Sequence, residues 1–349
     1  MQQEVIEAFA AQVLNDVAIA YSGVLVNIGH KLGLYRAMAG QGPLTSEQVA
    51  ERSGVRERYV REWLNNQRAG GYLHYDPALR AYTLPDEHAY VLVDTESPTF
   101  LAPAFDGASS IWLDEDKAID AIKSGQGMPW SAHHHRLFHA TEALFRNGYR
   151  DHLVGSWIPA IEGMDAKLRA GGKVADVGCG HGASSILMAK AYPAATIVGI
   201  DNHGPSLDIA RQRARDAGVS ANLTFEQADA RSYTTADCDL ICFMDALHDM
   251  GDPHLAASHA YSALAEDGAL LLVEPFANDD VEDNVGPVAR LFYAASLTMC
   301  TANALCDGDH ALGAQAGPAA TSEVLRRASF TRIRLACQTP MNIVYEVRR

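Results

Sequence analysis

The chain has few cysteines and no pair of them in a Cys-x-x-Cys spacing. The six are Cys179, Cys238, Cys242, Cys300, Cys306 and Cys337. Missing Cys-x-x-Cys pairs argue against the common zinc and dithiol motifs. Cys238 and Cys242 are four residues apart on an expected strand, so both point to one face. We therefore interpret them as core thiols rather than as a metal or disulfide pair.

Positive charge and long apolar runs are also scarce. The 349 residues carry 28 Lys and Arg against 43 Asp and Glu, a net charge of −15. Such an excess of acid argues against general affinity for nucleic acid or for an anionic membrane, although it leaves room for a local basic patch. No run of 18 apolar residues occurs, and the start MQQEVIEAF lacks the pattern of a signal peptide. We expect a soluble cytoplasmic protein without a membrane partner.

The most informative segment is KVADVGCGHG, residues 173–182. A short apolar strand over 174–177 is followed by Gly178, Gly180 and Gly182, and then by the helix-forming stretch ASSILMAKA. Glycine accepts positive φ and has no side chain, so a ligand can lie directly on the backbone of such a loop. The free N–H groups at the start of the next helix attract a carboxylate or a phosphate. The segment therefore predicts a ligand site between a strand and a helix.

Four further strands are predicted after this loop, over 195–201, over 222–230, within 238–253 and over 268–275, with helical stretches between them. Asp201 ends the second strand at the place of a Rossmann acid, where it can accept hydrogen bonds from ribose hydroxyls. The spacing G-x-G-x-G differs from the dinucleotide fingerprint G-x-G-x-x-G. The pattern predicts an α/β fold with a Rossmann-like sheet that binds a different nucleoside cofactor.

At this point the chain resembles the class I S-adenosylmethionine-dependent methyltransferases, over roughly residues 150–349. The resemblance implies a seven-stranded sheet, S-adenosyl-L-methionine as the cofactor and S-adenosyl-L-homocysteine as its product. It implies that the glycine loop holds the methionine part, Asp201 the ribose, and the acid after the third strand the adenine. The expected cofactor-binding residues are Asp176, Gly178, Gly180, Gly182, Asp201, Asn202, Asp229, Ala230, Met244, Trp157 and Tyr149. Trp157 and Tyr149 would lie against the sulfonium, or else are core aromatics.

Residues 1–100 predict a winged helix-turn-helix. Three helices, one with Thr45 and Gln48 in capping-box positions, precede two short strands around Asp76. The helix over 55–69 carries four arginines against two glutamates, which would suit DNA phosphates, so a cofactor-sensing transcriptional regulator is one alternative. Residues 1–100 as a whole carry 8 Lys and Arg against 12 Asp and Glu, a net of −4. Since the same module resembles the dimerisation domain of small-molecule O-methyltransferases, we expect a homodimer and no nucleic-acid partner.

Residues 101–150 are interpreted as a helical connector that covers the pocket. His135 and His139 are four residues apart on an expected helix, a spacing that can bind zinc. No matching cysteine or carboxylate set is apparent, so we expect no metal site.

The candidate catalytic residues lie in the segment from the fourth to the fifth strand. His248 follows the fourth strand, and Glu274 ends the fifth, so both are expected at the rim where open α/β sheets bind ligands. Asp252 and Pro253 predict the start of the helix between them. The segment resembles the O-methyltransferases, which implies that His248 is the general base and Glu274 its partner. Plant members have a second acid near the last helix, where this chain has Gln315.

We therefore predict a winged-helix dimerisation domain over 1–100, a connector over 101–150 and a methyltransferase domain over 151–349. An insertion over 277–317 is expected to form a lid or substrate wall, and two strands around Thr339 close the sheet. The predicted reaction is methyl transfer to a small-molecule acceptor, with an oxygen favoured over carbon or nitrogen. The alternatives are metal-assisted C-methylation of a substrate like a 2-oxo acid, and the regulator.

Overall fold

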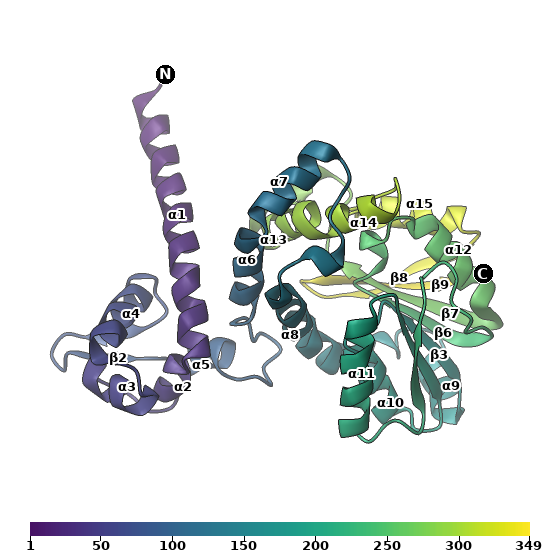
Figure 1. Ribbon diagram of the computed structural model, residues 1–349, viewed down its shortest axis with the longest axis horizontal. Helices are drawn as coiled ribbons and strands as arrows, with labels where there is room; N and C mark the ends of the chain where they lie inside the picture. Colours follow the sequence, from purple (N-terminus) through teal and green to yellow (C-terminus); the bar gives the residue numbers. More distant parts are fainter. The chain divides into compact units, whose positions relative to one another are not determined.

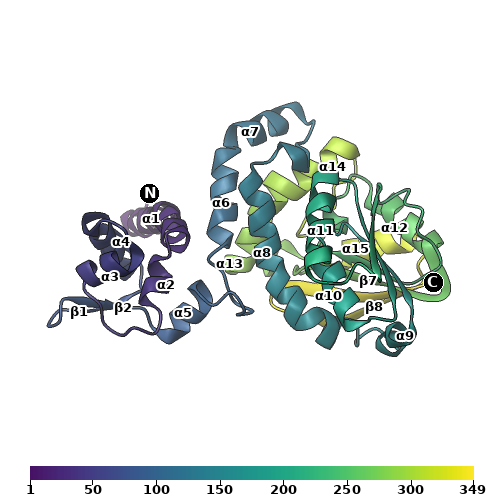
Figure 2. The same cartoon turned by 60° about the horizontal axis from the view of Figure 1, so that its bottom comes forward.

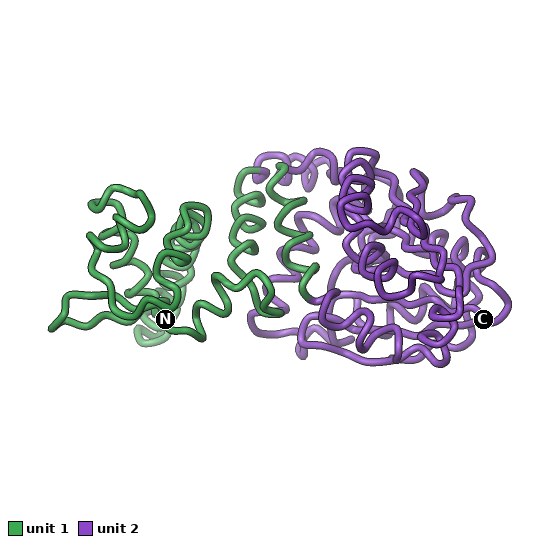
Figure 3. The backbone as a smooth tube through the Cα atoms, turned by 90° about the horizontal axis from the view of Figure 1, so that it is seen from below, with its two compact units in different colours: residues 1–113, 134–147 green, residues 114–133, 148–349 purple.

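The computed structural model describes residues 1–349 and divides into two compact units (Figure 3). The first unit contains Met1–Leu113 and His134–Asn147. The second contains Asp114–His133 and Gly148–Arg349. The segment predicted as a connector, 101–150, is thus shared between the two units.

The first unit is mainly helical, with one two-stranded ribbon (Figure 1). Its elements are α1 (Gln3–Lys31), α2 (Leu34–Met38), α3 (Ser46–Ser53), α4 (Glu57–Ala69), β1 (His74–Asp76), β2 (Ala81–Thr83), α5 (Asp86–Leu92), α6 (Ala104–Leu113) and most of α8 (His135–His152). The predicted capping box at the start of α3 is present, because Thr45 accepts the N–H of Gln48 and the Gln48 side chain accepts that of Thr45.

Trp63 of α4 anchors the core of the first unit. Its indole N–H donates to the carbonyl of Leu25 at 2.9 Å, and its ring lies edge-on to Tyr35. The ring also lies against the backbone of α1 at Gly29, where a Cβ would meet it at 2.5 Å. A larger residue at position 29 would therefore separate α1 from α4. This packing fixes the C-terminal part of α1 on the winged helix.

The N-terminal part of α1 leaves its apolar side chains exposed. Phe9 is 63% exposed, Leu14 70% and Ile19 58%. By length and composition alone, α1 is the one helix that could cross a membrane, and 6% of its most apolar window is buried. Soluble core helices and signal sequences near an N-terminus also pass this test. The feature is not evident in the sequence as a continuous apolar run, because Asn15 and Asp16 interrupt it.

The second unit contains a seven-stranded sheet and the helices that cover it (Figure 2). Its strands are β3 (Lys173–Val177), β4 (Thr196–Asp201), β5 (Leu223–Gln227), β6 (Cys238–Met244), β7 (Leu264–Pro275), β8 (Arg332–Gln338) and β9 (Asn342–Arg348). Its helical elements are α7 (Glu115–Ser124), η1 (Trp130–Ala132), η2 (Leu153–Trp157), α9 (Met164–Ala170), α10 (Ala183–Ala191), α11 (Gly204–Asp216), η3 (Leu247–Asp249), α12 (Pro253–Ala263), η4 (Val281–Asp283), α13 (Gly286–Ala295), η5 (Ser296–Cys300), α14 (Thr301–Asp307) and α15 (Gly317–Arg327).

The sheet order is β5-β4-β3-β6-β7-β9-β8. The first five strands are parallel, and β9 runs antiparallel to both β7 and β8. Every second residue of β3 and β6 faces the same side of the sheet, and Ala175 of β3 and Phe243 of β6 pack there with α12 and α15 in one core cluster. Asp176 points to the opposite face, where it meets Ser184 and Ser185 of α10. The predicted α/β fold with a seven-stranded Rossmann-like sheet is confirmed.

Because β3, β4, β6 and β7 are parallel, their carboxyl ends meet at one rim. The strand predicted over 222–230 ends earlier, at Gln227, so Asp229 and Ala230 lie in the loop that follows β5. The reason is local: the Asp229 carboxylate accepts the N–H of Arg231 at 2.8 Å, which turns the chain. The segment predicted as a lid, 277–317, is largely helical, as α13, η5 and α14.

Candidate functional site

The glycine loop leaves β3 in a sharp turn. Gly178, Gly180 and Gly182 have φ values of 78°, 51° and 77°, in the region that favours glycine. A Cβ on Gly178 would meet that of Ala246 at 2.7 Å, whereas one on Gly180 would meet nothing. The loop therefore packs closely at its base and is open at its middle, as a backbone ligand site requires.

Asp176 lies at the base of this loop and is fully buried. Its Oδ2 accepts the hydroxyls of Ser184 and Ser185 at 2.6 and 2.5 Å. Its Oδ1 has no hydrogen-bond partner. Burial raises the pKa of the carboxyl above its usual range, so the charged form would gain from a donor that is not part of the chain.

Asp201 connects the end of β4 to the same loop. Its Oδ2 accepts the N–H of Gly180 and its Oδ1 that of His203, both at 2.8 Å. Burial raises the pKa of Asp201 despite these two bonds. Each carboxylate oxygen can accept a further hydrogen bond. The neighbouring Asn202 is exposed, and its carbonyl accepts the Gln227 amide at 3.2 Å.

Asp229 is held by an arginine that sequence analysis did not single out. The Arg231 guanidinium donates to both carboxylate oxygens of Asp229, at 2.7 and 2.6 Å, and also to Asp307 at the end of α14. The bonds from Arg231 lower the pKa of Asp229. Asp229 is thereby tied to the segment predicted as a lid.

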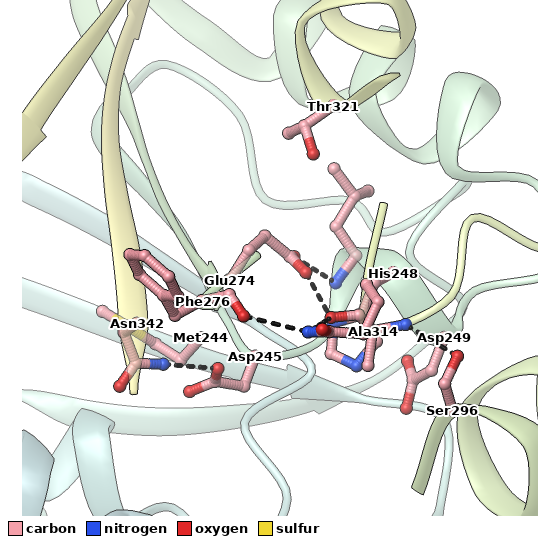
Figure 4. Close-up of polar contacts among 12 residues, drawn as sticks. Met244, Asp245, His248, Asp249, Glu274, Phe276, Ser296, Ala314, Thr321 and Asn342 are labelled. Carbon is pink, nitrogen blue, oxygen red and sulfur yellow. Dashed lines mark hydrogen bonds and ion pairs between the residues drawn. The ribbon is translucent and has the colours of Figure 1, made fainter. Parts of the chain in front are cut away.

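His248 and Glu274 meet at the rim, as predicted (Figure 4). The ring Nδ1 of His248 lies 2.5 Å from Oε2 of Glu274, and both side chains are buried. The other oxygen, Oε1, accepts the N–H of Leu247 at 3.2 Å. Burial alone would lower the pKa of His248, but the Glu274 carboxylate and the Cys300 thiol outweigh it and hold the pKa well above its usual value. Nδ1 faces Glu274, and the Cys300 thiol lies within hydrogen-bonding reach of the same ring.

Asp245 is a site residue that sequence analysis missed. It directly follows β6 and has a φ of 52°, unusual for a residue other than glycine. Its Oδ2 accepts the Tyr149 hydroxyl at 2.9 Å, and its Oδ1 accepts the Asn342 amide at 2.7 Å. Burial and the nearby Glu274 charge raise the pKa of Asp245 to about 7. Its position after a central strand was the only sequence signal, since its partners are distant in the chain.

Asp249 was also missed. Its carboxylate accepts the indole N–H of Trp130 at 2.9 Å, and its carbonyl accepts the Asn303 amide at 2.9 Å. Burial raises the pKa of Asp249 to about 6. These bonds tie η1 and α14 to the loop that carries His248.

The remaining predicted residues lie beside these groups. The Met244 carbonyl is within 3.4 Å of the Tyr149 hydroxyl, so Met244 and Tyr149 are both next to Asp245. Trp157 is buried at the end of η2, edge-on to Tyr149 and stacked on His152. The Gln315 amide donates to the carbonyls of Phe276 and Ala314, so it has a backbone role. No group of three or more His, Cys, Asp or Glu in residues 1–349 is arranged to hold a metal ion.

Comparison with known proteins identifies both parts of the chain. Residues 20–94 match the Rv2258c-like winged HTH domain, and residues 168–310 match a methyltransferase domain. Among curated proteins, a trans-aconitate 2-methyltransferase from Streptomyces coelicolor is 43% identical over 70 residues, 20% of this chain and 23% of that protein. The chain thus matches less than a quarter of the length of this relative.

Solved structures share the fold over nearly the whole chain. A candidate O-methyltransferase from Nostoc punctiforme has a TM-score of 0.74 at 20% identity and covers 97% of this chain and 98% of its own. Human N-acetylserotonin methyltransferase, solved with S-adenosylmethionine, has a TM-score of 0.69 at 19% identity, with 97% of each chain covered. The chain therefore carries a match to the Rv2258c-like winged HTH domain over residues 20–94 and a match to a methyltransferase domain over residues 168–310, and it has the fold of solved O-methyltransferases.

Proposed function

We propose that this protein transfers the methyl group of S-adenosylmethionine to an oxygen of a small-molecule acceptor, with His248 as the general base and Glu274 as its partner. The observation that carries the proposal is the 2.5 Å contact between His248 and Glu274 at the carboxyl rim of the sheet. His248 lies four residues after the end of β6, and Gly178 directly follows the neighbouring strand β3. A proton acceptor thus lies beside the loop that would hold the methyl donor.

Two observations support the fit of the glycine loop to the cofactor. The middle of the loop is open at Gly180, and the buried Asp176 retains an oxygen without a partner. We propose that Asp176 and the three loop glycines hold the methionine part, Asp201 with Asn202 the ribose, and Asp229 with Ala230 the adenine. Met244, Tyr149 and Trp157 would line the same space. When bound, the cofactor supplies an electrophilic methyl group on a positively charged sulfur.

His248 supplies the base. As the acceptor oxygen takes the methyl group from the sulfur of a bound cofactor, Nε2 of His248 would accept the hydroxyl proton. Glu274 stabilises the resulting imidazolium through Nδ1, and it also fixes the ring orientation. General-base assistance of this kind contributes about 10²–10⁴-fold. Holding the acceptor oxygen in line with the methyl group contributes further through orientation.

The raised pKa of His248 determines how the rate of methyl transfer changes with pH. Only the neutral imidazole can accept a proton, and its fraction grows as the pH rises toward the pKa. Transfer is therefore expected to accelerate with increasing pH until the base is fully deprotonated.

We also propose that the protein forms a homodimer through its N-terminal domain. The exposed apolar side chains of α1, among them Phe9, Leu14 and Val17, support this because a soluble protein rarely leaves such a surface uncovered. In α4, Arg61 pairs with Glu57 at 2.8 Å and Arg58 with Glu62 at 2.5 Å. Two of the four arginines are thus already paired within their own helix, which favours dimerisation over DNA binding.

The test is transfer of labelled methyl from S-adenosylmethionine into a small-molecule extract of the source cells. A labelled product whose methyl group is bound to oxygen supports the proposal. Label bound to carbon, with loss of transfer after chelation, would favour metal-assisted C-methylation instead. Cofactor binding without any transfer would favour the regulator, and retardation of upstream promoter fragments at low salt would then be measured.

A further inference from the structure

Asp245 is held in a strained backbone conformation at the rim. Four non-glycine residues have positive φ, namely Arg80, Asp237, Asp245 and Ser329. Asp245 is the one of the four that lies between the end of β6 and the His248 loop. Strain of this kind costs free energy and persists where the surrounding structure holds the residue for a purpose.

The contacts of Asp245 fix the direction of its carboxylate and leave both oxygens able to accept further hydrogen bonds. The Tyr149 hydroxyl reaches Oδ2 from the chain before the sheet. The Asn342 amide reaches Oδ1 from the start of β9 (Figure 4). Each oxygen thus accepts one hydrogen bond and can accept another. The side chain is half-buried rather than sealed, so a bound molecule can reach it.

Asp245 has no lysine or arginine partner, whereas two other carboxylates of this unit do. Glu346 pairs with Arg334 and Arg348, and Asp239 pairs with Lys167. The charged groups that act on Asp245 are Glu274 and His248, and neither is lysine or arginine. Since the His248 imidazole already faces Glu274, the surroundings of Asp245 are electrically negative and favour a positive charge.

We propose that Asp245 binds a protonated amino group of the acceptor, and that the acceptor is therefore an amine that also carries the hydroxyl to be methylated. This inference rests on the proposed function, because it assigns the second contact of the same acceptor. The two contacts have separate tasks: His248 takes the hydroxyl proton, while Asp245 accepts hydrogen bonds from an ammonium group that keeps its protons. The pKa of Asp245, about 7 without this partner, would fall when the ammonium is bound.

The inference separates this chain from relatives that share its methyltransferase domain. Several of those relatives are named as trans-aconitate 2-methyltransferases. Trans-aconitate is a tricarboxylate, and three carboxylates beside Asp245, Asp249 and Glu274 would be repelled. We therefore expect this protein not to methylate polycarboxylates.

Asp245→Asn is a variant that tests recognition rather than folding. Asparagine tolerates positive φ well. Its Oδ1 can still accept the Asn342 amide, and its Nδ2 can donate to the Tyr149 hydroxyl, so both internal bonds can persist. Only the charge and one acceptor oxygen are lost. Asp237→Asn is the matched control, because Asp237 has a φ of 54° but is exposed.

The experiment uses the full-length protein, labelled S-adenosylmethionine and the extract described above. The labelled product is separated by electrophoresis at pH 7 and again at pH 12. The proposal predicts a product that migrates as a cation at pH 7 and loses positive charge at pH 12. With that product's precursor, D245N should raise KM by about 10–100-fold, as expected for a lost charge-assisted hydrogen bond. Its affinity for S-adenosylhomocysteine, measured by calorimetry, should stay within about twofold of that of D237N.

The outcomes distinguish the role of Asp245 from methyl transfer itself. A labelled product that is neutral or anionic at pH 7 overturns the assignment of Asp245 and leaves methyl transfer intact. A loss of S-adenosylhomocysteine affinity in D245N as large as the change in KM also overturns it, because Asp245 would then bind the cofactor. Absence of any transfer contradicts the proposed function itself, and with it this inference.

Discussion

The carboxylate of Glu274 holds the His248 loop twice: Oε2 lies 2.5 Å from the imidazole Nδ1, and Oε1 accepts the backbone N–H of the residue before the histidine. Removing the charge with Glu274→Gln should lower the pKa of His248, because this carboxylate is the first of the two groups that raise it, ahead of the Cys300 thiol. The acidic limb of kcat/KM should therefore move to lower pH by about 1–3 units. The maximal rate should fall on the order of 10²-fold, since a weaker base assists less.

A pH–rate profile of E274Q measures both effects. Glu266→Gln, an exposed position on the same strand, is the control and should keep the profile of the unaltered protein. An acidic limb that stays in place in E274Q would show that another group titrates.

Gly178 should tolerate no side chain. In Gly178→Ala, the new Cβ would meet Ala246 at 2.7 Å, in addition to the strain of a φ of 78°. Gly218→Ala carries the same kind of strain at a φ of 71° but meets nothing within 4 Å. We expect G178A to lower the free energy of unfolding by about 1–3 kcal/mol more than G218A, the usual cost of overpacking.

The same pair tests the cofactor loop. Calorimetry with S-adenosylhomocysteine should show at least about a tenfold loss of affinity in G178A, which corresponds to 1.4 kcal/mol. G218A should bind normally. Equal affinity in the two variants would place the cofactor elsewhere.

Much of the glycine loop and of the elements around it could be predicted from the sequence, because their signals are local. Short apolar strands, glycines that require positive φ, and the Asp252–Pro253 helix start each occupy a few neighbouring residues, and the structure contains all of them. His248 and Glu274 could be placed at one rim because both follow parallel strands. Their 2.5 Å contact then follows from the adjacency of β6 and β7.

The rest depends on residues that are far apart in the chain. Asp245 contacts Tyr149 and Asn342, which are 96 and 97 residues away, and nothing near Asp245 in sequence announces either contact. The same holds for Trp130, which reaches Asp249 across 119 residues. These bonds arise only when η1, the end of α8 and β9 pack around the rim, so they could not be predicted from the local sequence pattern.

Binding of the charged cofactor should release protons. A sulfonium held at the rim would lower the pKa of His248, which is raised in the free protein, and that of Asp245, which is about 7. Both groups would then give up part of their bound proton at neutral pH. S-adenosylhomocysteine has no charge on sulfur and should release fewer protons.

Calorimetry at pH 7 in phosphate and in Tris, whose ionisation enthalpies differ, measures this release for the two ligands. In His248→Ala the difference between the ligands should shrink. Equal release, or proton uptake with S-adenosylmethionine, would place the sulfonium away from these residues.

The exposed side of α1 should form the dimer. Leu14 is 70% exposed, so Leu14→Glu should leave the fold of the chain intact while it places a charge in the proposed interface. Light scattering after size exclusion should give twice the chain mass of 37.6 kDa for the unaltered protein and the chain mass for L14E. Gln12→Glu adds a charge to an exposed polar position of the same helix, and we expect it to remain dimeric. A monomeric unaltered protein would contradict the proposal.

The central claim is that His248 is the base for methyl transfer, and single-turnover transfer of labelled methyl tests it most directly. The unaltered protein is compared with His248→Ala and with the control His254→Ala. The His254 ring contacts the carbonyl of Arg327. We predict that H248A loses about 10²–10⁴-fold in rate while its affinity for S-adenosylhomocysteine is unchanged, and that H254A transfers normally. Transfer by H248A at the unaltered rate would contradict the account.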